Sequence, residues 1–471
     1  MAKKTRKRAA PRGTRRARPV AKPAKPQVAH RNLKASEQHR LAGARRLAKA
    51  LAGSPSKVIR IPITNVYDGS DYSAQLVIGS GKATANVILD TGSSTLAVDP
   101  KAYGGTGDRN LKTTTYAQEV LYGTGGWAGP VVNTNLRFGN SSGSEVVLDS
   151  AAIAITSVQQ RGNFEGVTGI MGLAYNGLNS AYDFKSYFAQ NHRPATTYPW
   201  PFPSKSFKMF SHSFDTLVKL NKIPEVDVTP YFDQLENNGV VANKFAFYTL
   251  RSFVSLRGGS SQSAQAADPL NQGVFVLGGG EEQKDLYQGG FVSVGVLHDL
   301  YYNTNLKSVQ VDGCAAVAAA ALQPEYQDFM VSNSIVDSGT SDLSLAGDVY
   351  NAILAGLKQL SPAFLEAVQA SQQNRNGVAA SSLNLEKWPN IYFVLTGENG
   401  EDVRLTVSPQ TYWQVDFPAA GQAVFQVSGP LDKANQSILG LPLMNNYYTV
   451  FDRSQDSQGV IRFAPIKRPA K

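Results

Sequence analysis

Residues 87–96 read VILDTGSSTL, in which three aliphatic side chains lead directly into the carboxylate of Asp90 and small polar residues follow it. A β-branched apolar run predicts a buried strand, and a carboxylate at its end is costly to bury unless it is hydrogen-bonded or paired. Taken alone, the pattern is more typical of an ordinary turn, in which Gly92 supplies a positive φ and the hydroxyls satisfy backbone groups.

A second copy of this pattern lies farther along the chain. Residues 334–343 read SIVDSGTSDL, with two aliphatic residues before Asp337 and small residues after it. Each copy is followed by two apolar residues, a glycine and a leucine, as IMGL at 170–173 and ILGL at 438–441. Because both signals recur in the same order, the sequence predicts two related lobes that each contribute one carboxylate.

The rest of the chain is patterned like an all-β protein. From residue 57 onward, short apolar or alternating runs are separated by Gly, Asn, Asp and Ser, which is typical of strands punctuated by turns. Helical periodicity is scarce; its best cases are residues 347–360 and 231–239, the second ending at a Gly239 C-cap. Residues 257–273 are expected to form a surface loop, and residues 176–224 show no clear regular element in their middle.

Composition sets the broad class. The chain has 471 residues, of which 42% are hydrophobic, enough for two domains with buried cores. No apolar run is long enough to span a membrane. The single cysteine, Cys314, excludes an intrachain disulfide and favours a reducing compartment, and its side chain is expected to be a small buried hydrophobe. The five histidines lack ligand spacing, so no metal site and no cofactor are expected.

The net charge of +10 resides at the N-terminus. Residues 1–50 hold 17 of the 46 Lys and Arg but only one acid, which leaves a body of about −6. We therefore expect residues 1–55 to be a disordered basic tail that is either a solvated arm or a weak contact for polyanions. A propeptide that covers an acidic cleft is the less favoured alternative. No apolar segment of a secretory signal follows the tail, so a cytoplasmic location is expected. The body is divided into an N-terminal lobe, residues 56–250, and a C-terminal lobe, residues 251–471.

The two carboxylates have a chemical use if their loops face each other. Asp90 and Asp337 would then share one proton in acid, so that one accepts a proton from a water that attacks an amide while the other protonates the carbonyl oxygen. The glycines would allow close approach, and the hydroxyls would hydrogen-bond to the carboxylates or across to the opposite loop. The residues expected to support the pair are Thr91, Gly92, Ser93, Ser338, Gly339 and Thr340.

These motifs resemble those of the two-lobed, pepsin-like aspartic peptidases over residues 58–465. The resemblance implies a cleft between two β-lobes, an acid pH optimum, and peptide or unfolded protein as substrate for a monomeric enzyme. LYGTGGWAG at residues 121–129 is similar to the flap hairpin that closes over bound peptide. The substrate-binding residues that the resemblance implies are Tyr122, Thr124, Gly125 and Gly126 in the flap, and Ile88, Ile335 and Ser341 beside the pair.

The chain departs from the family at two places. Ala97 stands where the family usually has a tryptophan that steadies the flap tyrosine, and Trp127 is a candidate to compensate. The 176–224 segment is longer than the family's usual link. A catalytically inactive binding or inhibitor protein on the same fold is the alternative, disfavoured because Asp90, Asp337 and their hydroxyl partners are intact. A nucleic-acid-binding protein is a third interpretation, which rests on the tail alone.

Overall fold

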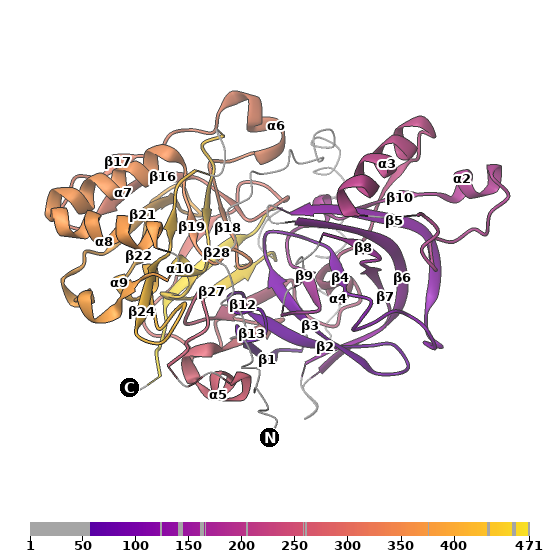
Figure 1. Ribbon diagram of the computed structural model, residues 1–471, viewed down its shortest axis with the longest axis horizontal. Helices are drawn as coiled ribbons and strands as arrows, with labels where there is room; N and C mark the ends of the chain where they lie inside the picture. The colour runs from indigo at the N-terminus through magenta and orange to yellow at the C-terminus, as the bar shows by residue number, and fades with distance from the viewer. Residues whose placement is uncertain are drawn as a thin grey trace, which may run out of the picture.

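The computed structural model describes residues 57–469 except 123–124, 140–144, 161–163, 165, 204–205, 258, 260, 375, 431–433 and 455–457. The basic tail and Thr124 therefore lie outside the described residues. Strands dominate the described chain and form two lobes, as Figure 1 shows, with the first half of the chain in indigo and magenta and the second in orange and yellow. The predicted all-β, bilobal fold is confirmed.

The first lobe contains a closed barrel. Its strands follow the hydrogen-bonding order β6-β7-β4-β9-β3-β2, and β2 pairs again with β6 to close the ring. Closure leaves no free strand edge within the ring. The bounds are β2 Ser73–Ile78, β3 Ala83–Asp90, β4 Leu96–Val98, β6 Gly125–Gly139, β7 Glu145–Ile155 and β9 Gly169–Gly172.

The sheet continues outward from β6 through a long hairpin. Strand β5 (Lys112–Tyr122) pairs with β6, and β10 (Ser180–Asp183) and β11 (Glu225–Asp227) extend the sheet beyond β5, while β8 (Val158–Gln159) pairs with β6. Between β10 and β11 the chain forms α2 (Lys185–Gln190) and α3 (Phe207–Leu220), at the upper right of Figure 1. The sequence did not predict α3, although Ser206 caps its N-terminus by accepting a bond from the Met209 amide at 3.4 Å.

A central antiparallel sheet joins the two lobes. Its order continues from β2 as β1-β13-β12-β27-β28-β14. The strands come from the start, the middle and the end of the described chain: β1 Ile59–Thr64, β12 Lys244–Tyr248, β13 Gln272–Leu277, β14 Val292–Gly295, β27 Tyr447–Asp452 and β28 Val460–Pro465. Phe245 of β12 stacks on Phe451 of β27 with ring centroids 5.1 Å apart, so the core is continuous across the junction.

The second lobe is built from three smaller sheets, with orders β15-β18-β26-β19-β25, β17-β16-β21-β22 and β20-β24-β23. Their bounds are β15 Asn303–Thr304, β16 Leu306–Val311, β17 Val317–Ala318, β18 Ser334–Val336, β19 Leu343–Ser344, β20 Val378–Ala379, β21 Ile391–Thr396, β22 Asp402–Val407, β23 Trp413–Val415, β24 Gln422–Phe425, β25 Val427–Ser428 and β26 Ser437–Leu439. Helices α7 (Gly347–Leu360) and α8 (Pro362–Gln373) pack against this lobe. Helix α7 covers the residues predicted to be helical and buries Val349, Ile353 and Leu357 at helical spacing.

The remaining short helices test two further expectations. Helix α4 (Tyr231–Asn237) ends at the C-cap Asn238, and Gly239 follows it with a φ of +68°, so the predicted glycine stop lies one residue beyond the cap. The expected surface loop at 257–273 instead contains α5 (Gln262–Ala267) and η2 (Pro269–Asn271), because Ser261 caps the first of them; that prediction was wrong. The remaining short helices of the described chain are η1 Asn176–Leu178, η3 Pro324–Tyr326, α6 Gln327–Met330, η4 Ala380–Ser382, η5 Leu385–Lys387, α9 Pro409–Tyr412 and α10 Leu441–Met444.

Within the described chain, the helices are all too short or too polar to cross a bilayer.

Candidate active site

The first aspartate loop is formed by a strand that ends beside a glycine. Asp90 is the last residue of β3, and the parallel strand β9 places Gly172 directly beside it. A Cβ on Gly172 would lie 2.4 Å from the Ser94 amide nitrogen. Only glycine therefore lets the chain after Asp90 pass over β9, which explains the apolar-apolar-glycine signal downstream of the motif.

The second loop repeats this construction. Asp337 follows β18, and β26 runs parallel to β18 with Val336 beside Leu439. The next residue, Gly440, has no space for a side chain, because its Cβ would lie 2.2 Å from the Asp342 carbonyl oxygen. The repeat seen in the sequence is thus a repeat in structure, with one such loop in each lobe.

Each aspartate is buried within hydrogen bonds from its own loop. Both side chains are only 7% exposed. The Gly92 amide donates to one carboxylate oxygen of Asp90 at 2.7 Å and the Ser93 hydroxyl to the other at 2.5 Å. Asp337 accepts equivalent bonds from the Gly339 amide at 2.9 Å and the Thr340 hydroxyl at 2.6 Å. Donation by the Ser93 and Thr340 hydroxyls agrees with the prediction, whereas donation by the Gly92 and Gly339 amides was not predicted.

The two loops face each other closely. A Cβ on Gly92 would lie 2.7 Å from an Asp337 oxygen, and a Cβ on Gly339 would lie 2.4 Å from an Asp90 oxygen. Any side chain at either glycine would therefore push the carboxyl groups apart. The structure brings Asp90 and Asp337 together from positions 247 residues apart in the chain.

Reciprocal hydrogen bonds between Thr91 and Ser338 hold this approach. The Thr91 amide donates to the Ser338 hydroxyl at 3.0 Å, and the Ser338 amide donates to the Thr91 hydroxyl at 2.9 Å. Each hydroxyl then donates to a carbonyl of the opposite strand, Thr91 to Val336 at 3.1 Å and Ser338 to Leu89 at 2.8 Å. All of these groups are buried, so the bonds fix the two loops relative to each other.

Burial and mutual repulsion determine the charge of the pair. Burial raises the pKa of Asp90 well above its usual range, and the neighbouring Asp337 carboxylate raises it further. The hydrogen bonds from Ser93 and Gly92 stabilise the anion and only partly offset this rise. The pair therefore retains one proton to higher pH than an isolated aspartic acid would, and it titrates as a unit.

A tryptophan within the flap holds the flap tyrosine. Strands β5 and β6 meet at the pairing of Tyr122 with Gly125, and the fully buried Trp127 donates its indole N–H to the Tyr122 hydroxyl at 3.2 Å. Trp127 packs in one cluster with Ala97, so its ring lies against the small side chain that replaces the family's usual tryptophan. Burial, and to a smaller extent the charge of Asp90, raise the pKa of Tyr122, which therefore stays a neutral phenol near the pair.

The other residues proposed for substrate binding differ in their surroundings. Ile88 packs with the Trp127 cluster beneath the flap, and Ile335 is buried on β18 next to the second loop. Ser341 donates its hydroxyl to Asp71 at 2.7 Å. In the flap, Gly125 pairs with Tyr122, whereas the Gly126 carbonyl already accepts from the Gln160 amide at 2.8 Å.

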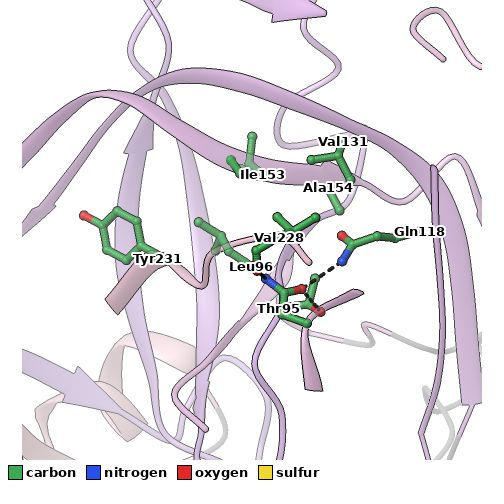
Figure 2. Close-up of a pocket in the computed structure, with 10 residues that line it drawn as sticks. Thr95, Leu96, Gln118, Val131, Ile153, Ala154, Val228 and Tyr231 are labelled. Carbon is green, nitrogen blue, oxygen red and sulfur yellow. Dashed lines mark hydrogen bonds between the residues drawn. The ribbon is translucent and has the colours of Figure 1, made fainter. Parts of the chain in front are cut away.

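A buried amide network anchors the first loop to the flap hairpin, as Figure 2 shows. The Thr95 hydroxyl and the Gln118 amide both donate to the Asn179 side-chain oxygen at 2.8 Å. Asn179 in turn donates to the Val228 carbonyl at 2.8 Å. One side chain therefore joins the loop after Asp90, strand β5 and the ends of the segment that carries α2 and α3.

The sequence interpretation missed Tyr301 as a neighbour of the pair. Burial, and to a smaller extent the charges of Asp337 and Asp90, raise the pKa of Tyr301 to about 12, so its hydroxyl lies within electrostatic reach of both carboxyls. Tyr301 lies between β14 and β15, far from either motif in the chain. No local pattern marks it, because its position depends on the packing of the second lobe.

The comparisons with known proteins agree with this site. The model of the eukaryotic aspartyl protease family matches residues 71–193 and 218–465, so the chain belongs to that family. The matched residues contain both aspartate loops, both glycine segments and the flap. The gap between them, residues 194–217, falls in the segment between β10 and β11.

Curated relatives are similar at low identity. Pepsin A of Sus scrofa is 22% identical over 86% of this chain and 83% of its own length. Pepsin-3 of Oryctolagus cuniculus is 22% identical over 84% and 81%. Beta-secretase of Strongylocentrotus purpuratus is 21% identical over 84% of this chain, which spans 66% of that protein's length. These similarities support a hydrolase of the aspartic peptidase kind.

Proposed function

We propose that the protein is an aspartic endopeptidase that hydrolyses peptide bonds with a water activated between Asp90 and Asp337. The observation that carries the proposal is the pair itself, with two buried carboxyl groups in contact and each held by an amide and a hydroxyl of its own loop. A structural carboxylate pair would have no need of a flap hairpin that brings a tyrosine near it.

The chemistry follows from one proton shared by two carboxyls. The ionised carboxyl accepts a proton from water as the oxygen attacks the amide carbon, and the protonated carboxyl donates its proton to the carbonyl oxygen. A hydroxyl of the resulting gem-diol then gives its proton to the carboxyl that is now ionised. The other carboxyl, which took the proton of the water, gives it to the amide nitrogen, and the C–N bond breaks to give an acid and an amine with one proton left on the pair.

The pH dependence should be bell-shaped and lie in acid. Activity needs the singly protonated pair, which exists only between its two apparent pKa values. Because burial and Asp337 raise the pKa of Asp90, the proton is retained into weakly acid solution. Above that range both carboxyls ionise and no general acid remains.

The surroundings of the pair favour an extended peptide with apolar side chains beside the scissile bond. Ile88 and Ile335 flank the two loops, and Tyr301 lies within electrostatic reach of both carboxyls. The flap strands β5 and β6 offer backbone groups that an extended chain can meet from above. Unfolded proteins are therefore the expected substrates.

The test is hydrolysis of an unfolded protein from about pH 2 to about pH 8, with and without a statine-type transition-state analogue. Replacing Asp90 or Asp337 by Asn should lower kcat/KM by at least about 100-fold, because neither carboxyl can take over the other's role. The matched control is Asp149→Asn on the exposed side of β7, which should retain full activity. Analogue binding without turnover at any pH would instead indicate an inactive binding protein.

A further inference from the structure

A second hydrophobic core lies on the outer face of the flap hairpin. Its base is formed by Ala117 of β5, Ala128 of β6 and Val158 of β8. The rest comes from the segment between β10 and β11, namely Phe184, Phe188, Phe202, Phe207, Phe210, Phe214 and Ile223. The aromatic rings pack on one another, for example Phe184 on Phe202 at 4.8 Å and Phe210 on Phe214 at 5.2 Å between centroids.

This core reaches the flap near its tip. The ring of Phe207, the first residue of α3, occupies the space above Gly126, where a Cβ would lie 2.5 Å from the Phe207 Cζ. Gly126 pairs with Leu121, one residue from the pairing of Tyr122 with Gly125. Helix α3 therefore contacts the hairpin on the face opposite to the one that carries Tyr122.

One carboxyl group lies within this contact. Glu119 of β5 is on the same face as Ala117 and Leu121, because side chains alternate along a strand. Both of its carboxyl oxygens are shielded from solvent and neither has a hydrogen bond of normal geometry. The pKa of Glu119 is raised to about 7, chiefly by burial and further by the charge of Asp215 of α3, while Ser211 of α3 partly offsets the rise.

From this geometry we infer that the described parts of the segment between β10 and β11, residues 184–203 and 206–224, form a clamp that positions the flap over the catalytic pair. The clamp is docked while Glu119 is protonated and loosens when Glu119 ionises near Asp215. Phe207 and Glu119 are positioning residues that act through the flap. The catalytic consequence rests on the proposed peptidase function, but docking itself is measured without substrate. Phe202, Phe207, Phe210 and Phe214 of this core lie in the 194–217 gap of the family match, whereas Phe184, Phe188 and Ile223 lie within the matched residues.

Among the described residues, the charged and titratable groups beside the flap come from helix α3, and Asp215 is the one whose charge acts on Glu119. Helix α3 presents Lys208, His212 and Asp215 to an open pocket of about 750 Å³ beside the flap, together with Ser211. From the sheet side, the described residues of that pocket, Leu121, Gln159 and Gln160, are uncharged. Lys219 lies 4.0 Å from Asp215 on the solvent side of α3 and is largely exposed, so it screens Asp215 only weakly.

The sign of the effect follows from linkage. The pKa of Glu119 is higher when the clamp is docked, so docking binds a proton that the undocked state releases. Docking is therefore complete below the ordinary range of a glutamate and weakens as pH rises through about 7. The flap is held in place in the acid range in which the pair has its single proton.

Hydrogen exchange on the full chain without substrate tests docking directly. After correction for intrinsic rates, amides of α3 and of the β5–β6 hairpin should exchange at least ~10-fold faster at about pH 8 than at about pH 5. Glu119→Gln has the same shape but no charge, and should keep the slow rates at both pH values. Glu366→Gln, at an exposed position on α8, is the matched control and should behave like wild type. Equal rates for wild type at both pH values would overturn the proton dependence.

The contact at Phe207 is tested separately. Phe207→Ala should expose the hairpin at both pH values and raise KM more than it lowers kcat, and Phe207→Leu should restore most of the protection and affinity. Unchanged hairpin exchange in Phe207→Ala would overturn the clamp. If Phe207→Leu failed to restore the slow exchange of the hairpin amides, the clamp would also be overturned, because the loss in Phe207→Ala would then reflect general misfolding rather than positioning of the flap. If wild type showed the exchange pattern without any turnover, the proposed function would fail while the clamp stood.

Discussion

The carboxyl group of Asp90 is subject to two opposing influences. Burial and the neighbouring Asp337 raise its pKa, while Ser93 and Gly92 stabilise the anion. A carboxyl pair needs both influences. Burial and repulsion keep one proton on the pair, and the hydrogen bonds stabilise the one remaining negative charge. At the scale of single residues, the site therefore depends on small donors at fixed positions rather than on further charged groups.

The indole of Trp127 permits a residue-scale test. Trp127→Phe removes the hydrogen bond to Tyr122, worth about 0.5–1.5 kcal/mol, and should lower kcat/KM by roughly 2- to 10-fold. Tyr122→Phe should cause a similar loss, and the double variant should be no worse than either, because both remove one interaction. Steady-state kinetics of the cycle measure this. Trp413→Phe in the second lobe is the control, since that indole N–H is buried without a partner; additive losses would contradict the assignment.

At the scale of elements, each aspartate loop packs closely against a neighbouring strand, the first against β9 and the second against the end of β26. Each close approach requires a residue without a side chain. Gly172 and Gly440 are the close-approach positions, and both meet backbone atoms rather than flexible side chains. The backbone cannot move aside without disturbing the aspartate on the neighbouring strand. The glycine segments are therefore part of the site although they do not touch substrate.

Gly172→Ala and Gly440→Ala should each lower the free energy of unfolding by about 1–3 kcal/mol, because a Cβ there overlaps backbone atoms. Both should also lower kcat, since the overlap displaces an aspartate loop. Urea unfolding and steady-state kinetics check the two effects. Gly81→Ala is the control, because no atom lies within 4 Å of its Cβ position; an equal loss in that variant would show that close approach is not the cause.

At the scale of the whole molecule, the lobes are joined by the central sheet and by a buried ion pair. Arg453 at the end of β27 donates to Asp233 of α4 at 2.7 Å, and the two side chains are 1% and 2% exposed. The guanidinium also lies 4.3 Å from the ring centroid of Tyr175. The pair links the C-terminal strands to the helix that follows the first lobe's barrel.

Asp233→Asn should destabilise the protein by about 3–5 kcal/mol, because Arg453 would remain charged and buried without its counter-ion. The midpoint of urea unfolding measures the loss. Asp402→Asn breaks the exposed pair with Lys307 and should cost less than about 1 kcal/mol. Similar losses in the two variants would show that burial does not control the energetics.

Stability should be greatest in weak acid. Asp90, Glu119 and Asp342 have raised pKa values, chiefly through burial, so the folded state holds protons that the unfolded state releases, and stability falls as pH rises toward about 7. Asp108 acts in the opposite direction. Burial alone would raise its pKa, but hydrogen bonds from Ser80, Thr134 and Tyr103 outweigh burial and lower it, so the stability that the ionised Asp108 contributes is lost as pH falls through the acid range. Thermal midpoints across pH should peak at about pH 4–5, and Glu119→Gln should flatten the neutral side.

The basic tail, which lies outside the described residues, is tested by its charge. Deleting residues 1–50 changes the net charge from +10 to about −6. If the tail contacts polyanions, full-length protein should bind DNA or RNA with an affinity that falls steeply with salt, and the truncated chain should not bind. Filter binding at two salt concentrations measures this. A tenfold rise in peptidase activity on truncation would instead indicate that the tail occupies the cleft.

The sequence by itself determined the local chemistry of this protein. The repeat of an aspartate motif and a glycine segment predicted two lobes and one carboxyl pair, because both signals are short and depend on neighbouring residues only. Helix α7 was likewise readable from its apolar spacing. The hydroxyl partners of the pair could be named because each lies within a few positions of its aspartate.

Only the tertiary structure decided the features that depend on distant segments. Tyr301 beside the pair, the Trp127 ring against Ala97, and Phe207 above Gly126 all arise from packing between segments that carry no common motif. Helix α3 was missed because its aromatic face reads as an irregular run until the flap hairpin supplies the surface on which it is buried. Burial also determined which carboxyls keep a proton, and burial is a property of the folded chain rather than of any stretch of its sequence.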